Sequence, residues 1–193
     1  EALVAALLAQ RVCGRVLHNT THNKRVRELV AKTGVPVIET GNLPAEPLDM
    51  AVSYSNFEAA RAMTAHLGRL GYRKIGFVTL PLRDNDRSKE RRRGYFAALK
   101  ELGLPVDPSL VLEAPGGFSE GADALVRLMQ THPGLDAGFF AGDVLAVGAL
   151  FECQRRGWAV PGRVAIASFD DLDLLCHAVP TVTTLRIPRQ EIG

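Results

Sequence analysis

The chain has 193 residues, of which 47% are hydrophobic and 23% charged, and this composition favours a packed globular fold over a disordered chain. Its formal net charge of +2 is too small to indicate nucleic-acid binding by the chain itself. Residues 1–10 are apolar, but they are too short to cross a membrane and lack the basic flank of a signal peptide. We therefore expect no membrane partner and interpret 1–10 as a helix within a domain of a larger protein.

The three cysteines are odd in number and far apart in the sequence, at Cys13, Cys153 and Cys176. This spacing gives neither a disulfide framework nor a zinc site, so we expect free thiols and a reducing, cytoplasmic compartment. His18 and His22 have i, i+4 spacing but lie at a strand end and in a loop, so no metal site is expected there.

Strand and helix patterns alternate along the chain, with few exceptions. In chain order, strands are predicted at 12–18, 35–39, 74–80, 109–113, 135–141 and 164–169. Helices are predicted at 1–10, 24–33, 56–70, 90–102, 119–131 and 144–156. Strands that alternate with helices of this length indicate parallel sheets with right-handed crossovers, so the predicted fold class is doubly wound α/β.

Two segments interrupt this alternation. Residues 40–55 contain Gly41, Pro44 and Pro47 and are too long for an ordinary connection between a strand and a helix. An extended segment after Thr184 suggests a second passage, back into the first part of the chain. Two lobes joined by more than one strand form a hinge, and the cleft between such lobes is a natural site for a small molecule.

Candidate binding residues follow from the strand ends. Asp170 comes directly after the apolar strand 164–169, at the edge where ligands bind in open α/β sheets. Arginine donates paired hydrogen bonds to a carboxylate or diol, aspartate accepts from hydroxyls, and an aromatic ring stacks on a sugar-like face. The sequence therefore indicates a site for a polyhydroxylated ligand. Its candidate residues are Arg91, Phe118, Asp170, Asp143, Glu58 and Asn56.

Structural alternatives stay open for several of these residues. Arg91 can also be read as a solvated helix residue, Phe118 as ordinary core and Asp143 as a helix N-cap. The chain has no G-x-S-x-G elbow, no phosphate-cradling loop and no arguable catalytic constellation, so we expect neither an enzyme nor a cofactor. A small doubly wound sugar enzyme is the weakest of the hypotheses.

Five stretches of the chain, taken in order, form a distinctive set. They are SNFEAARAMTAHLGRLGYRKIGFV (55–78), ERRRGYFAALKELGLPVDP (90–108), GFSEGADAL (117–125), DAGFFAGDVLAVGALFECQRRGWAVPGRVAIASFDD (136–171) and PTVTTLRIPRQEIG (180–193). Together these stretches resemble the effector-binding region of the LacI/GalR transcriptional regulators. Within that family the chain is most similar to gluconate-utilisation repressors, through NFEAAR, VGALFECQRRG and LRIPRQEIG.

The resemblance implies a periplasmic-binding-protein-like fold of two lobes that closes on a small effector. It implies a partial N-terminal lobe, 1–52 and 186–193, and a C-terminal lobe, 53–185, without a helix-turn-helix domain. Arg91 and Asp170 match the family's effector-contacting arginine and aspartate, Phe118 its aromatic stacking position, and Glu58 lies near another contact position. The family usually has Asn-Asp where this chain has Gly142-Asp143.

The function implied is a sugar or sugar-acid sensor within a DNA-binding repressor that pairs as a homodimer through its second lobe. Operator DNA would be bound only by a separate N-terminal domain. Val147, Leu150 and Phe151 are candidates for the dimer interface, with an intramolecular core role as the open alternative. A periplasmic sugar-binding protein of a transporter has the same fold and is the alternative function.

Overall fold

The computed structural model of the protein describes residues 12–193 and divides the chain into two compact units. Unit 1 comprises the residues up to Ser55 together with Asp84–Arg87 and Pro188–Gly193, and unit 2 comprises Asn56–Arg83 and Ser88–Ile187. The lobe boundaries expected from the sequence placed Asp84–Arg87 in the second lobe, whereas the structure groups this segment with unit 1. The helix predicted at 1–10 lies outside the described residues.

Unit 1 contains a small parallel sheet with the strand order β1-β2-β3. Its elements are β1 (Arg15–Leu17), α2 (Lys24–Thr33), β2 (Val37–Glu39), β3 (Met50–Ala51) and α8 (Arg189–Ile192). Helix α2 has the bounds expected from the sequence: Asn23 Oδ1 accepts from Val26 N at 2.9 Å at its start, and Gly34 ends it with a φ of 61°. Val26, Val30 and Val37 form the core.

Unit 2 is a five-stranded parallel sheet with the order β5-β4-β6-β7-β8. Its strands are β4 (Ile75–Thr79), β5 (Val111–Glu113), β6 (Ala137–Phe140), β7 (Ala165–Phe169) and β8 (Thr183–Leu185). The predicted strand 109–113 is shorter because Pro108–Leu110 form a 3-10 helix, which begins where Asp107 Oδ1 accepts from Ser109 N at 2.9 Å. The residues around Thr184, expected only as an extended passage, form the edge strand β8.

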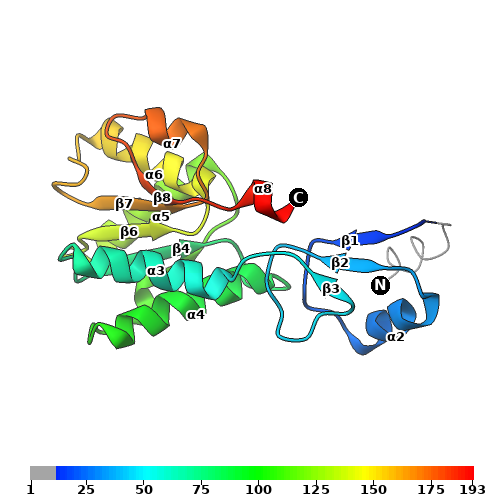
Figure 1. The fold of residues 1–193 in the computed structure, drawn as a ribbon. Coiled ribbons are helices and arrows are strands. Elements are labelled where there is room, and N and C mark those ends of the chain that lie inside the picture. The colour runs from blue at the N-terminus through cyan, green and yellow to red at the C-terminus, as the bar shows by residue number, and fades with distance from the viewer. Residues whose placement is uncertain (1–11) are drawn as a thin grey trace. The chain divides into compact units, whose positions relative to one another are not determined.

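Helices cover both faces of this sheet (Figure 1). They are α3 (Asn56–Arg69), α4 (Asp86–Glu101), α5 (Phe118–Thr131), α6 (Asp143–Arg156) and the short α7 (Asp173–His177). Figure 1 shows α3 and α4 on one face and α6 on the other. Every residue of β4, β6 and β7 is buried, as expected of strands that are covered on both faces.

The two faces of the unit 2 sheet have separate cores. Under α3 and α4, the ring of Phe77 stacks on Tyr95 with centroids 4.8 Å apart and meets Phe139 edge-on at 5.3 Å. The buried Tyr95 hydroxyl donates to Ile75 O at 2.7 Å, so this core leaves that polar group satisfied. On the other face, α5 and α6 contribute Leu125, Leu128, Leu145 and Leu150.

The strand order determines where a ligand site is expected. Strand β4 comes first in the chain, β5 lies on one side of it and β6 on the other, so the connections diverge between β4 and β6. In doubly wound sheets, this divergence opens a crevice at the carboxyl ends of the strands, and ligands bind there. The functional groups of unit 2 should therefore be sought at the ends of β4, β6 and β7.

Candidate functional site

Arg91 lies at this divergence point and is held in place on several sides. It is half-buried on α4, its Nε donates to Asn56 Oδ1 at 2.8 Å, and its Nη1 donates to Ala141 O, just beyond β6, at 2.8 Å. Its guanidinium carbon lies 3.6 Å from the ring centroid of Phe169, the last residue of β7. The side chain is thus fixed against the ends of two neighbouring strands and is not a freely solvated helix residue.

Asp170 follows Phe169 directly, so the structure brings Arg91 and Asp170 to the same edge of the sheet. Asp170 is half-buried and has a φ of 78°, in the left-handed region that residues other than glycine rarely adopt. Its Oδ1 accepts from Asp171 N at 3.0 Å, and the Thr184 hydroxyl donates to its carbonyl oxygen. A strained conformation of a non-glycine residue is characteristic of functional positions.

Asn56 is buried beside Arg91 and is not placed as a direct ligand contact. It is the first residue of α3 and is fully buried, with 0% of its surface exposed, and its carboxamide oxygen accepts from Arg91. Its geometry makes Asn56 a residue that orients Arg91. Glu58 lies two residues further along the same helix with an exposed carboxylate, which accepts from Arg61 Nη2 at 2.7 Å and Nε at 2.9 Å.

Phe118 and Asp143 each begin a helix. Phe118 is the first residue of α5 and is 52% exposed, so the alternative that it is ordinary core does not hold. Asp143 is the first residue of α6, not the residue before the helix, and its Oδ1 accepts from the next backbone amide, Val144 N, at 2.7 Å. Gly142 is the N-cap and makes no side-chain capping bond.

The three predicted interface residues separate into two groups. Val147 and Leu150 are each 1% exposed and belong to the hydrophobic core between α6 and the sheet, so they have no surface to present to a partner. Phe151 is 41% exposed and is the one of the three that lies at the surface. The prediction of an interface through Val147 and Leu150 is therefore corrected, and the core alternative applies to both.

The parts of the site that act through Arg91 were not predicted from the sequence. Neither the Phe169 ring under the guanidinium nor the carbonyl oxygen of Ala141 that accepts from it was expected. An aromatic residue directly before a strand-ending aspartate was the available signal for Phe169. Backbone acceptors such as Ala141 O have no sequence signal, because every residue supplies one.

Unit 1 has its own polar group at the carboxyl ends of β1 and β2. Arg87 Nη1 donates to His18 Nε2 at 2.7 Å, which leaves Nδ1 to carry the proton and donate to Thr40 Oγ1 at 2.9 Å. Asp86 Oδ2 accepts from the Thr20 amide and hydroxyl at 3.0 and 2.5 Å. Burial alone would raise the pKa of Asp86, but the hydrogen bonds from Thr20 and Arg87 N lower it below the usual range.

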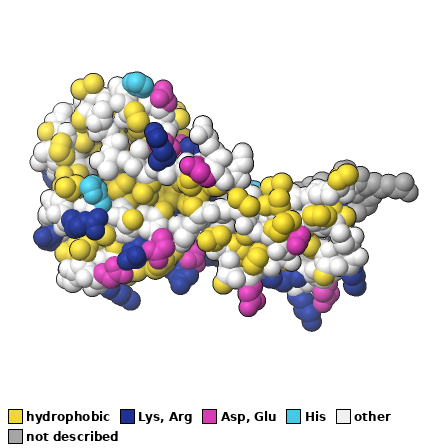
Figure 2. Space-filling view, viewed as in Figure 1, with side chains coloured by type: hydrophobic (Ala, Val, Ile, Leu, Met, Phe, Trp, Pro, Cys, Tyr) yellow, Lys and Arg dark blue, Asp and Glu magenta, His cyan; other side chains and the backbone are white. Residues whose placement is uncertain are grey.

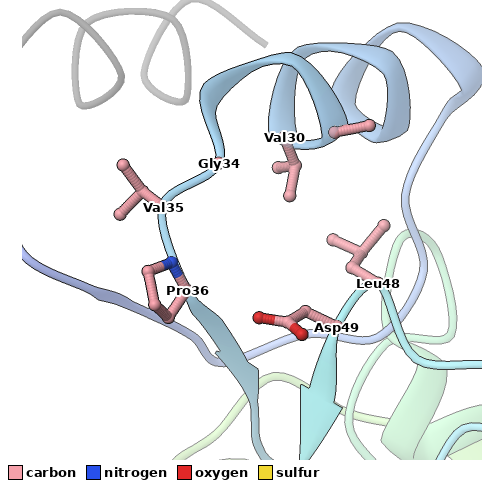
Figure 3. Close-up of a pocket in the computed structure, with 7 residues that line it drawn as sticks. Val30, Gly34, Val35, Pro36, Leu48 and Asp49 are labelled. Atoms are coloured by element: carbon pink, nitrogen blue, oxygen red, sulfur yellow. The ribbon is translucent and has the colours of Figure 1, made fainter.

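A hollow of about 280 Å³ lies at the opposite edge of the unit 1 sheet (Figure 3). Figure 3 shows Val30 of α2 and Gly34, which follows that helix, on one side, Val35 and Pro36 before β2, and Leu48 and Asp49 before β3. The Asp49 carboxylate already accepts from Val37 N at 3.0 Å. This hollow adjoins the amino ends of the strands, so it is not where ligands bind in parallel sheets.

Other site classes find no support in residues 12–193. Within that range there is no group of three or more His, Cys, Asp or Glu side chains that could hold a metal ion, and His22 instead pairs with Glu39 Oε1 at 2.8 Å. None of the helices described there is long and apolar enough to span a bilayer. On the face drawn in Figure 2, acidic and basic side chains of unit 2 are interspersed and form no single-sign patch.

Comparisons with known proteins agree with this architecture. Residues 64–193 match the family model described as a periplasmic binding protein-like domain. The HTH-type transcriptional regulator GntR of Escherichia coli (strain K12) is 35% identical over 188 residues, covering 97% of this chain and 56% of that protein. The chain thus spans a little over half the length of this curated relative.

Solved structures show the same relationship. A LacI family transcriptional regulator from Silicibacter pomeroyi is 30% identical with a TM-score of 0.91, and the match covers 100% of this chain and 72% of that one. A structure of the transcriptional regulator CelR in complex with cellobiose is 28% identical with a TM-score of 0.85, covering 100% and 59%. The chain belongs to the periplasmic-binding-protein-like domain family, in the form found in LacI/GalR transcriptional regulators.

Proposed function

We propose that this chain is the effector-sensing part of a LacI/GalR-type transcriptional repressor and that its effector is a sugar or sugar acid. The observation that carries the proposal is the fixed guanidinium of Arg91 at the divergence point of the unit 2 sheet, against Phe169, the residue directly before Asp170. Relatives named as transcriptional regulators favour this role over that of a transporter's binding protein or an enzyme.

The chemistry of these groups suits a hydroxyl-rich ligand. A guanidinium held in one orientation donates a planar pair of hydrogen bonds to a carboxylate or a vicinal diol without losing further side-chain entropy. The Asp170 carboxylate accepts from sugar hydroxyls, and the exposed ring of Phe118 offers an apolar face to the C–H groups of the ligand. Asp143 completes the proposed contacts, and Asn56 acts through Arg91.

The division into units supports a switch. The chain crosses between the units after Ser55, Arg83, Arg87 and Ile187. Several connecting segments therefore join the units, as in a hinge. We propose that the partial N-terminal lobe comprises 1–52 and 186–193 and the C-terminal lobe 53–185, except for Asp84–Arg87, which belong to unit 1. An effector that binds one relative orientation of the lobes better than another shifts the balance between them.

In the whole protein, this shift would change how a homodimer presents its DNA-binding domains to the operator. The dimer would pair through the C-terminal lobe with Phe151 at its surface, and the protein would act in the cytoplasm. Glu58 is a peripheral candidate contact, because its carboxylate is already paired with Arg61.

Isothermal titration calorimetry of the chain with D-gluconate, with D-glucose for comparison, tests the proposal. Arg91→Ala or Asp170→Ala removes a charged hydrogen bond and should weaken gluconate binding by about 10- to 100-fold. Arg69→Ala, an exposed arginine at the end of α3, is the matched control and should bind as the wild type does. Equal gluconate affinity in the wild type, Arg91→Ala and Asp170→Ala would refute the assigned site.

A further inference from the structure

A second hollow, of about 490 Å³, lies in unit 2 beside the edge strand β5. Phe96 of α4, Pro108 and Leu112 provide apolar lining, and Arg92, Arg127 and Glu113 provide charged groups. Strand β5 ends the sheet, so one side of its backbone has no neighbouring strand. The lining of the hollow thus combines apolar and charged side chains, as small-molecule sites do.

The two arginines of this hollow differ from the adjacent Arg93 in their partners. Neither the Arg92 guanidinium nor the Arg127 guanidinium has a hydrogen bond or an ion pair with any residue in the described part of the chain. By contrast, the adjacent Arg93 donates to both carboxylate oxygens of Glu90 at 2.6 and 2.8 Å. Two guanidiniums from different helices thus line one hollow without an anionic partner from the described chain.

Glu113 limits the charge of the ligand. Its Oε2 accepts from Leu82 N at 2.8 Å, which ties the carboxylate to the loop after β4. With two guanidiniums and one carboxylate, the hollow has one net positive charge, which a monoanion balances. A dianionic phosphate would bring a second negative charge close to Glu113, so a carboxylate fits better.

We propose that this hollow binds a small organic carboxylate with an aromatic or branched apolar body. The carboxylate lies between Arg92 and Arg127, and the body packs against Phe96 and Leu112. This site is separate from the proposed effector site, because Arg91 is engaged by Asn56 and Ala141 at the ends of the central strands. The proposal does not depend on the identity of the effector.

Calorimetric titration of the chain with benzoate tests this site, since benzoate combines one carboxylate with one apolar ring. Benzamide has the same shape without the charge, and acetate has the charge without the ring. We expect benzoate to bind at least about tenfold more tightly than either, because each lacks one of the two interactions. Benzoate affinity should also fall as sodium chloride rises, since the guanidiniums are partly solvated.

Substitutions of the two arginines test whether benzoate binds in this hollow. Arg92→Gln and Arg127→Gln keep a helix-forming side chain of similar length, and each should weaken benzoate binding by about tenfold, with the double variant below detection. Arg69→Gln is the control and should leave the affinity unchanged. Thermal unfolding of each variant shows whether it is folded. A folded double variant that binds benzoate like the wild type would overturn the proposal, and so would equal affinity for benzamide.

The two proposed sites are distinguished by one further variant. Arg91→Ala should weaken gluconate binding and leave benzoate binding unchanged, whereas Arg92→Gln should do the reverse. If Arg91→Ala abolished benzoate binding while the protein remained folded, benzoate would be binding at the effector site and the second site would be refuted. Gluconate binding can fail without affecting the benzoate result, so the two proposals stand or fall separately.

Discussion

The crossing of α5 and α6 provides the sharpest test of the packing, through the substitution Gly148→Ala. A Cβ atom at position 148 would lie 1.9 Å from Phe118 O and 2.7 Å from the carbonyl carbon of Phe118. At the same crossing, a Cβ on Gly121 would lie 2.1 Å from Leu145 O. All these neighbours are backbone atoms of the facing helix, so no side-chain rotation can relieve the clash.

The expected effect is the difference between two opposing contributions. Alanine favours the helix over glycine by about 1 kcal/mol. Against this, separating two packed helices to admit a methyl group strains a core that includes the fully buried Leu145 and Leu150, and overpacking of this kind costs about 1–3 kcal/mol or more. Because the clash is with backbone at less than 2 Å, we expect the upper part of that range and a net loss of about 1–2 kcal/mol in the free energy of unfolding.

Urea unfolding followed by far-ultraviolet circular dichroism measures this loss. Gly134→Ala is the control, because the nearest atom to its Cβ would be the side-chain Cδ of Lys74 at 3.7 Å, an ordinary contact. Its free energy of unfolding should stay within about 0.5 kcal/mol of the wild type. If Gly148→Ala unfolded at the same or a higher urea concentration than the wild type, with the same slope, the close backbone approach of α5 and α6 would be disproved.

Three further predictions concern other parts of the molecule. Asn56→Leu removes the acceptor that orients Arg91, so gluconate should bind about tenfold more weakly in calorimetry, and unchanged affinity would show that Asn56 plays no positioning role. The pKa of Asp86 is lowered in the fold, mainly by Thr20 acting against burial, so its contribution to stability is full above the unfolded pKa and is lost as the pH falls through the folded one. The excess in free energy of unfolding of the wild type over Asp86→Asn should therefore be full near pH 7, begin to fall near pH 4, around the unfolded pKa of an aspartate, and be lost only at more acidic pH, below the folded pKa; a constant difference would contradict this. Burial, with a smaller effect of the neighbouring Glu152, raises the pKa of the Cys153 thiol to about 11, so a disulfide reagent at pH 8 should modify only the two exposed cysteines until the protein unfolds.

The sequence could predict the elements of unit 2 because their signals are local. The apolar runs at β4, β6 and β7 follow from burial on both faces, and the glycine at 157 ends α6 with a φ of 64°. The start of α4 could not be found in this way. The helix begins at Asp86, four residues before the predicted start, and Asp86 receives hydrogen bonds from Thr20, which is 66 residues away in the chain. Long-range contacts of this kind leave no periodic pattern.

The candidate site shows the same division between local and distant information. Arg91 and Asp170 could be named because each is a charged residue in a distinctive local context. That Val147 and Leu150 are buried could not be predicted. Helix α6 buries eight of its residues, so its sequence shows no clear polar face that would indicate which side is exposed. Which residues of α6 are buried depends on the packing of α5 and the sheet against it, and the sequence of α6 alone does not contain this information.

The arginine run 91–93 illustrates why neighbouring residues of one type need separate interpretations. Successive side chains on an α-helix point about 100° apart, so three consecutive arginines face three environments. Arg91 is fixed at the strand ends, Arg92 lines the hollow beside β5, and Arg93 pairs with Glu90 on the same helix. A change in position of this turn of α4 would move both proposed binding groups together. Any coupling between the two ligands should therefore show as a change in benzoate affinity when gluconate is present, measured with each arginine substituted in turn.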